Sequence, residues 1–454
     1  MLMETRKQMR ALIMSTLAFA VSFAVWTMFS VIGVRIAADL QLNDTQFGLL
    51  VATPILSGAL ARLPLGMLAD RYGGRRVYAV LMLCVAVSIY ALTFATHYWQ
   101  YLGIGLFVGL AGGTFAVGSA YVSAWFGTRH QGTVMGVFGA GNAGAAITNL
   151  AAPLLVVGYG WTMVPTVYAA AMLAMAALFW LLTDEDPLHA QRMRQQTCLP
   201  LAQQLAPLRH AMVWRLGFFY FVVFGSFVAV ALWLPKYYIG EYHLNIAAAS
   251  FITLLFTLPS GVVRALGGWM SDRYGGRFVN RTVFWTMLVS LVLLAVPQTT
   301  LIAHGVDSDL VIGIGPGIMV FTILVFVLGL AQGIGKASVY RCIADYYPGQ
   351  VGVVGGLVGV LGGLGGFVLP VMFGAVVDLT HLRSSAFGIL LVLTVSAILW
   401  LQRTVRAEQA DALPVKPRVV RWWYGYDESV ARHGRQYPRP PDEPDDTVLV
   451  RNLR

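Results

Sequence analysis

Two arginines at matching positions in the two halves of this chain are the residues best suited to do chemistry. Arg62 lies in the apolar stretch SGALARLPLGML and Arg264 lies in SGVVRALGGWM, each eight residues before the Asp of a DRYGGR segment. A guanidinium carries forked donors and a permanent charge, which suit a planar oxyanion. The two arginines therefore predict a binding site for a small anion.

The chain around these arginines has the composition of a polytopic membrane protein. Of its 454 residues, 57% are hydrophobic and 11% are charged, and the mean hydropathy is +0.69. A helix of about 20 apolar residues crosses a hydrocarbon core and satisfies its own backbone there. We therefore predict an all-α membrane protein with twelve transmembrane helices, since no ten-residue alternating strands compete with them. Their expected ranges are 10–33, 46–68, 77–95, 99–122, 133–157, 162–182, 214–235, 249–269, 283–303, 317–340, 351–377 and 385–402.

No acidic residue is placed to neutralise the two arginines. All 21 Asp and Glu residues and all eight His residues fall in expected loops, at helix ends or in the C-terminal tail. A charge inside a membrane is costly, so it usually pairs or lines a water-filled path. We expect the partner to be an anion that binds and leaves. We expect no enzyme activity, no metal site and no cofactor, because no nucleophile–base pair, metal-ligand cluster or phosphate loop accompanies the arginines.

Basic residues indicate the orientation, because cytoplasmic loops retain Lys and Arg. With a cytoplasmic N-terminus, the N-terminal segment and the loops after helices 2, 4, 6 and 8 hold fourteen of the 31 basic residues, and the opposite loops hold three. We expect a multi-pass protein of the cell inner membrane, embedded in the lipid bilayer, with both termini in the cytoplasm. Topology and a basic tail account for most of the net charge of +10, so no nucleic-acid partner is expected.

An internal repeat divides the chain. The segment GMLADRYGGRR recurs about 200 residues later as GWMSDRYGGRF. Two six-helix bundles related in this way place a shared site between them near the middle of the membrane, reached alternately from each side. The expected division is an N-terminal bundle over 1–183, a cytoplasmic linker over 184–213, a C-terminal bundle over 214–403 and a partly disordered cytoplasmic tail over 404–454.

Each DRYGGR segment combines a carboxylate at a helix end, a tight glycine turn and basic residues beyond it. This spacing permits an Asp–Arg gate that locks one conformation. The expected gating residues are Asp70, Arg71, Asp272 and Arg273. The two copies resemble the loop motif of the major facilitator superfamily. That resemblance implies the superfamily's fold of two pseudo-symmetric six-helix bundles.

Within that superfamily the chain resembles the nitrate/nitrite porters of the NarK type, up to about residue 405. Helix 5, GTVMGVFGAGNAGAAITNL, is similar to the family's glycine-rich signature, and helix 11 contains GVVGGLVGVLGGLGG. Small residues let helices approach closely. The expected packing glycines are Gly136, Gly139, Gly141, Gly144, Gly356 and Gly359. Asn142 has glycines on both sides and offers donors and an acceptor, so we expect it to contact the substrate.

The resemblance also implies the remaining substrate-binding residues. Arg62 and Arg264 match the paired arginines that hold the anion in these porters. Phe115 in GGTFAVGSA matches an aromatic position lining the site, and Tyr220 and Phe224 in FFYFVVFGSF match the aromatics of helix 7. For each aromatic residue taken alone, ordinary packing would be an adequate explanation.

Lys336 in GIGKASVY is a further cation within a predicted helix. A buried lysine can release its proton where an arginine cannot, so Lys336 is the candidate for proton coupling. The alternative is a side chain that extends toward the cytoplasmic surface. The GKAS segment resembles the porters that carry nitrate together with protons.

The resemblance implies a secondary active transporter that imports nitrate by alternating access. We expect symport of nitrate with protons, which would serve nitrate assimilation. The expected partners are nitrate, protons and, as a second anion, nitrite. We expect the protein to be a monomer. A nitrate/nitrite antiporter is the alternative, because exchange needs no titrating residue. A transporter of another small organic anion and a non-transport membrane sensor rank lower, since two arginines with aromatic walls suit a small planar anion and the tail is small for an output module.

Overall fold

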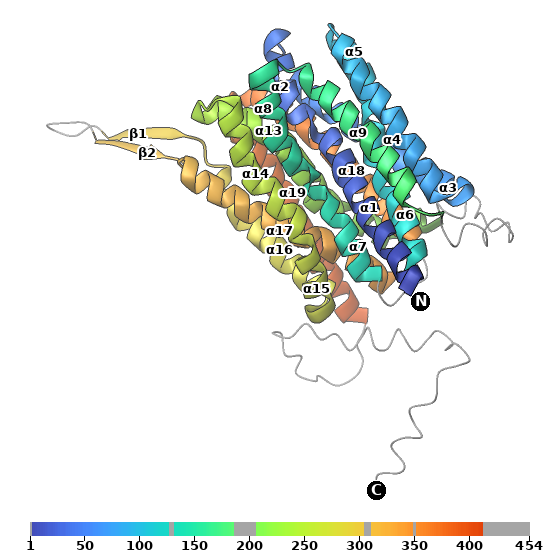
Figure 1. Ribbon diagram of the computed structural model, residues 1–454. Helices are drawn as coiled ribbons and strands as arrows, with labels where there is room; N and C mark the ends of the chain where they lie inside the picture. The colour runs from blue at the N-terminus through green and yellow to red at the C-terminus, as the bar shows by residue number, and fades with distance from the viewer. Residues whose placement is uncertain (1, 127–130, 186–205, 304–309, 348–350, 412–454) are drawn as a thin grey trace. The chain divides into compact units, whose positions relative to one another are not determined.

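The protein is a bundle of membrane-length helices, here described from a computed structural model (Figure 1). The structure describes residues 2–126, 131–185, 206–303, 310–347 and 351–411. Within these ranges eleven helical segments are long and apolar enough to cross a membrane, and a bent pair of helices makes twelve when it is counted as one span. The predicted all-α membrane fold is therefore confirmed.

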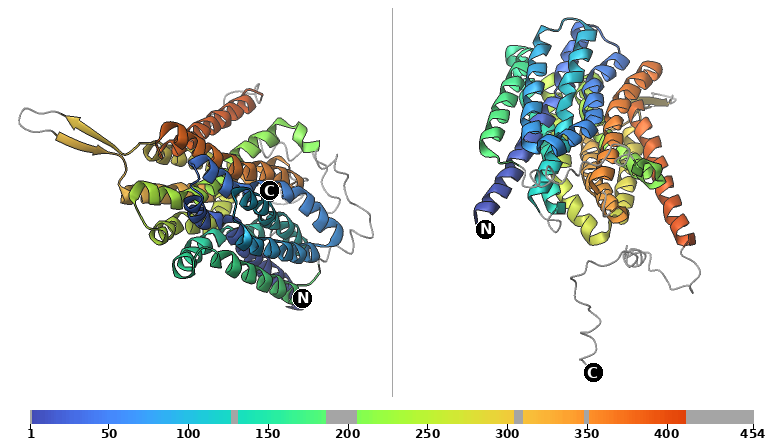
Figure 2. Two further views of the ribbon diagram at one scale, coloured as in Figure 1. Left: turned by 90° about the horizontal axis from the view of Figure 1, so that it is seen from above. Right: turned by 90° about the vertical axis from the view of Figure 1, so that its right-hand side faces the viewer.

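The first six spans lie between Thr5 and Leu182, and three of them are interrupted by a short break. Their helices are α1 (Leu2–Thr27) continued by α2 (Phe29–Asp39), α3 (Asp44–Tyr72), α4 (Gly74–Ala91), α5 (Tyr98–Val108) joined through a 3₁₀ turn at Gly109–Gly113 to α6 (Thr114–Trp125), α7 (Gln131–Gly139) joined through a 3₁₀ turn at Ala140–Ala143 to α8 (Gly144–Tyr159), and α9 (Met163–Leu182). In the right-hand view of Figure 2 these helices, blue to teal, lie together on one side.

The second six spans begin at Ala211, and the bend in one of them positions an arginine. The helices are α12 (Ala211–Tyr220) joined through a π-helical turn at Phe221–Gly225 to α13 (Ser226–Tyr242), α14 (Ile246–Val262), α15 (Arg264–Tyr274), α16 (Gly276–Leu294), α17 (Ile318–Tyr346), α18 (Val351–Thr380) and α19 (Ser385–Asp411). α14 and α15 meet at 41°. Pro259 near the end of α14 removes a backbone donor, which favours such a kink. Arg264 is the first residue after the bend.

The ninth helix differs from its predicted range of 283–303. α16 starts earlier and ends at Leu294, and a two-stranded antiparallel hairpin follows, formed by β1 (Thr299–Ala303) and β2 (Leu310–Ile314) with Thr299 opposite Ile314. Pro297 stops the helix, and the β-branched run after it favours a strand. The predicted helical range was therefore wrong at its end, where residues 299–303 form a strand of the hairpin that extends away from the helices in Figure 1.

α3 of the first half and α18 of the second half run in close contact. A Cβ added at Gly48 would overlap the carbonyl of Pro370, and one added at Gly374 would overlap the carbonyl of Asp44. A Cβ at Gly363 would lie 2.6 Å from the Cβ of Ala59. Glycine is needed at these points because the two backbones approach too closely for a side chain.

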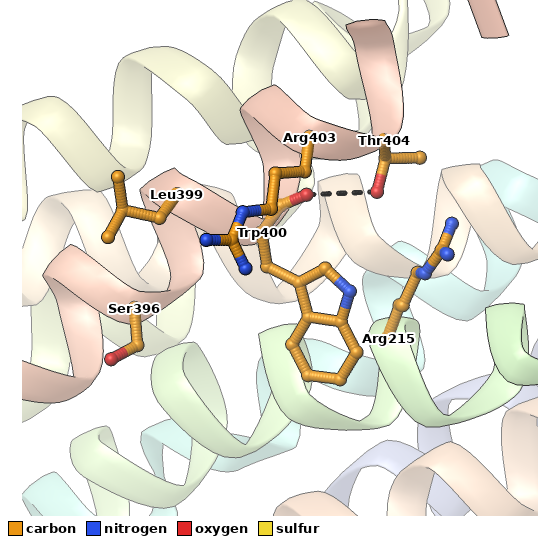
Figure 3. A pocket seen from close by; sticks show the side chains of 6 residues that line it. All are labelled: Arg215, Ser396, Leu399, Trp400, Arg403 and Thr404. Carbon is orange, nitrogen blue, oxygen red and sulfur yellow. Dashed lines mark hydrogen bonds between the residues drawn. The ribbon is translucent and has the colours of Figure 1, made fainter. Parts of the chain in front are cut away.

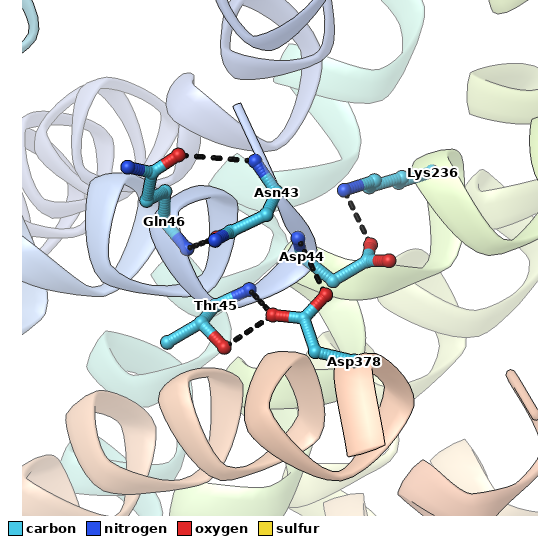
Figure 4. Close-up of polar contacts among 6 residues, drawn as sticks. All are labelled: Asn43, Asp44, Thr45, Gln46, Lys236 and Asp378. Carbon is cyan, nitrogen blue, oxygen red and sulfur yellow. Dashed lines mark hydrogen bonds and ion pairs between the residues drawn. The ribbon is translucent and has the colours of Figure 1, made fainter. Parts of the chain in front are cut away.

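Polar side chains join the two halves where α3 begins, which we call the Asp44 end (Figure 4). The Asp378 carboxylate of α18 accepts hydrogen bonds from the backbone N–H groups of Asp44 (3.1 Å) and Thr45 (2.9 Å) and from the Thr45 hydroxyl (2.5 Å). Lys236 of α13 forms an ion pair with Asp44 at 2.6 Å. The first N–H groups of a helix have no partner within it and favour a negative charge. A carboxylate of the second half therefore caps a helix of the first half.

The opposite end of α3, which we call the Gly73 end, carries the DRYGGR turns. Gly73 and Gly275 both have positive φ, 90° and 85°, which glycine adopts without strain. Asp272 forms an ion pair with Arg341 of α17 at 2.9 Å, whereas the Arg273 guanidinium lies over the Trp269 ring.

Among the gating residues whose side chains the structure describes, Asp272 forms its ion pair outside the motif and not with Arg71 or Arg273. Asp272 contacts α17 of its own half, and Arg71 lies over the adjacent Tyr72 ring at 5.4 Å. The side chain of Asp70 lies outside the described residues. The role of these four residues as a gate stays a prediction.

The predicted division of the chain also stays a prediction. Most of the predicted linker, at 186–205, and most of the tail, at 412–454, lie outside the described residues. The described helices all belong to one compact unit. The last helix, α19, continues to Asp411 and is longer than its predicted range of 385–402.

Replacing Asp378 by Asn should weaken the contact between the halves at the Asp44 end. A neutral amide oxygen is a weaker acceptor for the donors of Asp44 and Thr45. Hydrogen bonds to a charged group contribute about 1.5–3 kcal/mol, so the ratio of open to closed molecules at this end should rise about tenfold. The rate at which a membrane-impermeant maleimide modifies Ile55→Cys, a buried position facing Gly366, measures this change in a variant without native cysteines.

Glu241→Gln is the matched control for this measurement. It removes a carboxylate from the same end of the bundle, but its partner Arg383, at 3.5 Å, belongs to the same half. The modification rate should stay unchanged. An equal increase in both variants would contradict a specific role of Asp378 in joining the halves.

Candidate functional site

Arg62 is buried in the middle of the bundle and is surrounded by aromatic rings. Its side chain is 5% exposed, and Nη1 donates a hydrogen bond to the carbonyl oxygen of Gly359 on α18 at 2.6 Å. The guanidinium carbon lies 5.8 Å from the ring centre of Trp26, 5.7 Å from that of Phe115 and 5.3 Å from that of Phe224. Cation–π contacts of this kind contribute about 2 kcal/mol when they are desolvated. They partly replace the water that the cation has lost.

Arg264 lies against the same phenylalanine from the other half of the chain. It is also 5% exposed, and its guanidinium carbon lies 5.6 Å from the Phe115 ring centre and 5.8 Å from that of Tyr340. A Cβ at Gly139 would lie 3.0 Å from both Cζ and Nε of Arg264. The two guanidiniums are close enough to repel each other. The bend before α15 thus brings Arg264 close to Arg62, and Gly139 of α7 leaves room for its guanidinium.

Aromatic side chains of α12, the π-helical turn and α17 form a wall beside the arginines. Tyr220 stacks on Phe224 with ring centres 5.0 Å apart and planes at 8°. Tyr340 of α17 contacts Tyr220 edge-on at 5.2 Å, and its hydroxyl donates to the carbonyl of Gly355 at 3.1 Å. π-helical turns often occur at functional sites, because the extra residue changes the direction of the side chains around it. Here Phe224 belongs to the turn, and Tyr220 directly precedes it.

Asn142 adds an unpaired polar group near this cluster. It is 1% exposed on the 3₁₀ turn at Ala140–Ala143, one turn after Gly139, and its Nδ2 has no hydrogen-bond partner. A buried donor without a partner costs about 1–3 kcal/mol. The amide is therefore available to a bound ligand.

Lys336 is a third cation next to the arginine pair. It is fully buried, its Nζ donates to the Ser260 hydroxyl at 3.2 Å, and it lies 3.5 Å from the ring centre of Phe227. It is within electrostatic range of Arg264. Among the described residues, no carboxylate forms an ion pair with Arg62, Arg264 or Lys336. The centre of the bundle therefore carries positive charge that a bound anion would reduce.

Comparison with known proteins identifies the family. The sequence model of the Major Facilitator Superfamily matches residues 14–320. The protein named "Probable nitrate/nitrite antiporter NarK1" of Thermus thermophilus is 40% identical over 415 residues, which span 88% of this chain and 93% of that protein. The chain belongs to the nitrate/nitrite porters of the major facilitator superfamily.

Other relatives agree with this membership, and a solved structure has the same fold. "Probable nitrate/nitrite transporter NarK2" of Mycobacterium tuberculosis is 30% identical over 82% of this chain and 90% of its own length. "Nitrite extrusion protein" of Bacillus subtilis is 27% identical over 81% of this chain and 87% of its own length. The crystal structure of a bacterial homologue of the lysosomal transporter Spinster covers 90% of this chain and 99% of its own at 15% identity and a TM-score of 0.66. The family is one of transporters, so this protein is a transporter and not an enzyme.

In this porter the structure brings most of the predicted substrate-binding residues into one cluster. Arg62 contacts Phe115 and Phe224, Arg264 contacts Phe115, and Tyr220 stacks on Phe224. Lys336 lies beside this cluster near Arg264. Their assignment to substrate and proton binding stays a prediction.

The predicted packing glycines behave in different ways. A Cβ at Gly144 would overlap the carbonyl of Ala20, and one at Gly141 would approach Phe19, so both pack closely against α1. Gly359 packs against side chains of the site, since a Cβ there would lie 3.3 Å from both Arg62 Nη1 and the Tyr340 hydroxyl. Gly356 was assigned wrongly: it is exposed, and a Cβ there would meet no atom within 4 Å.

Several residues of the cluster were absent from the sequence prediction. Trp26 contacts Arg62 and donates its indole N–H to the Pro54 carbonyl at 2.8 Å. Tyr340 lies four residues after Lys336, so helical spacing could have placed it on the same face. The carbonyl of Gly359 had no sequence signal as a partner of Arg62, because any backbone carbonyl of α18 could have taken that place.

Replacing Gly139 by Ala should displace Arg264, whereas replacing Gly136 should not. The Gly139 Cβ would come 3.0 Å from the guanidinium, but the nearest atom to a Gly136 Cβ is the Ala265 Cα at 3.9 Å. Losing one forked pair of charge-assisted bonds should weaken anion binding about tenfold in Gly139→Ala. The affinity is measured from the rise in the melting temperature of each purified variant as the concentration of a small anion is increased. Equal affinities in the two variants would show that Arg264 does not hold the anion.

Proposed function

We propose that this porter transports nitrate, and that it imports nitrate by alternating access between its two halves. The observation that carries this proposal is the arginine pair: two buried guanidiniums, one from each half, lie against Phe115 with no carboxylate partner among the described residues. Nitrate is a planar monoanion whose oxygens suit forked N–H donors. The names of the relatives, which refer to nitrate and nitrite, support the same substrate.

The surroundings of the arginines explain how a small anion would be held. Nitrate between Arg62 and Arg264 would lessen the repulsion between them and accept the hydrogen bond that Arg62 now gives to Gly359. The rings of Phe115 and Phe224 leave flat apolar surface beside the charge. Such walls favour a small planar anion over a bulkier organic anion, which is the lower-ranked substrate class.

Uptake of an anion requires an energy source. Moving one negative charge into a cell that is negative inside costs about 2.3 kcal/mol per 100 mV. Symport with protons would supply this energy, and Lys336 is the proposed proton-coupling residue because it is buried beside Arg264 with a serine as its hydrogen-bond partner. The second candidate is exchange of nitrate for nitrite. It is favoured by the antiporter name of the relative that is 40% identical.

The contacts between the halves fit a transporter closed at one end. Asp378 and Lys236 join them at the Asp44 end, and Asn149 of α8 donates to the Thr257 hydroxyl of α14 at 3.1 Å. Under the proposed topology the Asp44 end faces away from the cytoplasm. Breaking these contacts would open the arginine pair to that side.

Uptake of labelled nitrate into proteoliposomes tests the function and its coupling. In the wild type, an inward proton gradient should stimulate uptake without internal nitrite. Lys336→Gln should lose this stimulation but retain exchange of nitrate for nitrate, because the arginines remain charged. Lys7→Gln, which removes a lysine paired with Asp184 at the surface, should behave as the wild type.

Two results would change this proposal. Stimulation by internal nitrite alone would establish exchange and leave Lys336 a structural role. Failure under both conditions would contradict nitrate transport and favour the organic anion.

Replacing Arg62 by Lys should lower nitrate transport at least about tenfold. The charge remains, but a lysine lacks the planar fork that binds two oxygens at once. The initial rate of labelled nitrate uptake at saturating and limiting concentrations measures the effect. Arg281→Lys, an exposed position on α16, is the control and should leave the rate unchanged. Full transport by Arg62→Lys would contradict the proposed grip.

A further inference from the structure

A cavity of about 450 Å³ lies outside the arginine pair, between α12 and α19 (Figure 3). Its lining consists of one arginine of α12 and a stretch of α19 that includes a second arginine and a tryptophan. The lining residues are Arg215, Ser396, Leu399, Trp400, Arg403 and Thr404. The transport mechanism proposed above uses none of them.

The cavity lies at one end of the membrane span. Arg215 is in the first turns of the span Ala211–Tyr242, and Arg403 is in the last turn of the span Ser385–Thr404. Arg403 follows Ser385 by 18 residues, or about 27 Å along the helix axis. That length crosses most of the hydrocarbon core, so the two arginines lie at the level of the lipid headgroups.

The side of α19 next to the cavity faces lipid. Leu399 is 50% exposed, and Val395 and Val392, one and two turns deeper in the membrane, are 38% and 66% exposed. These positions follow helical spacing and form one apolar strip. The strip leads from the cavity along the helix toward the middle of the bilayer, where an acyl chain could pack against it.

Within the part of the chain that the structure describes, no carboxylate compensates the charges of the cavity. Among the described residues neither Arg215 nor Arg403 forms an ion pair, and no Asp or Glu lines the cavity. The Nε of Arg215 is buried and has no hydrogen-bond partner. Trp400 is held in place by Phe218, with ring centres 5.3 Å apart. Figure 3 shows both arginine side chains beside this tryptophan.

We propose that this cavity binds the headgroup of an anionic phospholipid. The two guanidiniums would hold the phosphodiester, since forked donors suit phosphate oxygens and basic pockets at the cytoplasmic side attract anionic lipids. Trp400 lies at the depth where tryptophan prefers the interface. The strip of Val392, Val395 and Leu399 would carry one acyl chain.

General retention of positive charge on the cytoplasmic side is a simpler account of the arginines, but it does not explain their arrangement. An arginine that only marks orientation can extend into water and solvate all of its N–H groups. Arg215 instead turns Nε into the protein, where it has no partner. Two arginines from distant parts of the chain also share one cavity, which orientation alone does not require.

Quenching of Trp400 fluorescence by brominated lipids tests the proposal on the full-length protein in liposomes. The signal of Trp400 is the difference between the wild type and Trp400→Phe. Brominated phosphatidylglycerol should quench it with about fivefold higher relative affinity than brominated phosphatidylcholine, because each basic residue near the surface contributes to anionic-lipid binding. The double variant R215Q/R403Q should lose the preference while its melting temperature shows that it is folded.

The control is Arg281→Gln, an exposed arginine on α16 at the same end of the bundle, which should keep the full preference. Equal loss in this control would overturn a specific site, since it would indicate the general surface charge. Equal quenching by both lipids, or by neither, would also overturn the proposal. Removal of the preference by inorganic phosphate would assign the cavity to a free anion and not to a lipid.

Discussion

The structure depends on keeping three cations inside the membrane. Within the residues that the structure describes, no carboxylate pairs with them. Arg62, Arg264 and Lys336 are each at most 5% exposed. Burying a lone charge costs several kcal/mol, and that cost must be met by other contacts. Aromatic faces, one backbone carbonyl and one serine hydroxyl provide them. These contacts are weaker than an ion pair. In the proposed function, an anion between the arginines would supply the opposite charge that these contacts lack.

The hydrogen bond from Arg62 to Gly359 links ligand binding to the contact between the halves. Arg62 belongs to α3 and Gly359 to α18, the two helices whose backbones touch at Gly48 and Gly374. A ligand that takes over the Nη1 donor removes one of the polar bonds across this interface. The Asp44 end keeps the same two helices together through Asp378. In the proposed mechanism, binding and opening would therefore act on one helix pair, which would give a direct physical route for coupling them.

The sequence predicted the parts of this arrangement that repeat or that follow from local pattern. Hydropathy gave the helices, and the repeated DRYGGR segment placed Arg62 and Arg264 at equivalent sites. It did not predict the hairpin after α16, because a hydrophobicity pattern there continued past Pro297. The sequence also did not predict which residues form hydrogen bonds between distant helices. Asp378 could be assigned to a helix end, but its position over the N-terminus of α3 depends on how two distant helices pack.

Trp26 illustrates the same limit at the site. A single tryptophan within an apolar helix is equally suited to lipid or to the core, and only packing decides which. In the structure a close approach of α1 to the glycines of the fourth span turns the indole toward Pro54 and Arg62. By contrast, Phe115 and Phe224 were found through the family's motif. Helical periodicity predicts which face of a helix a residue occupies, but not which residue of another helix it meets.

The connection of α17 to the aromatic wall bears on the choice between symport and exchange. Gln332 donates to the Ser226 hydroxyl at 2.8 Å, and one turn later Lys336 lies on the ring of Phe227. Ser226 and Phe227 directly follow the π-helical turn, which contains Phe224 and begins one residue after Tyr220. Loss of the proton from Lys336 would end the cation–π contact with Phe227. The hydrogen bond from the Gln332 amide to Ser226 would then remain as the polar contact between these helices. The protonation state of Lys336 would then be transmitted to the rings beside Arg62, whereas an exchanger would have no use for a titrating group at this point.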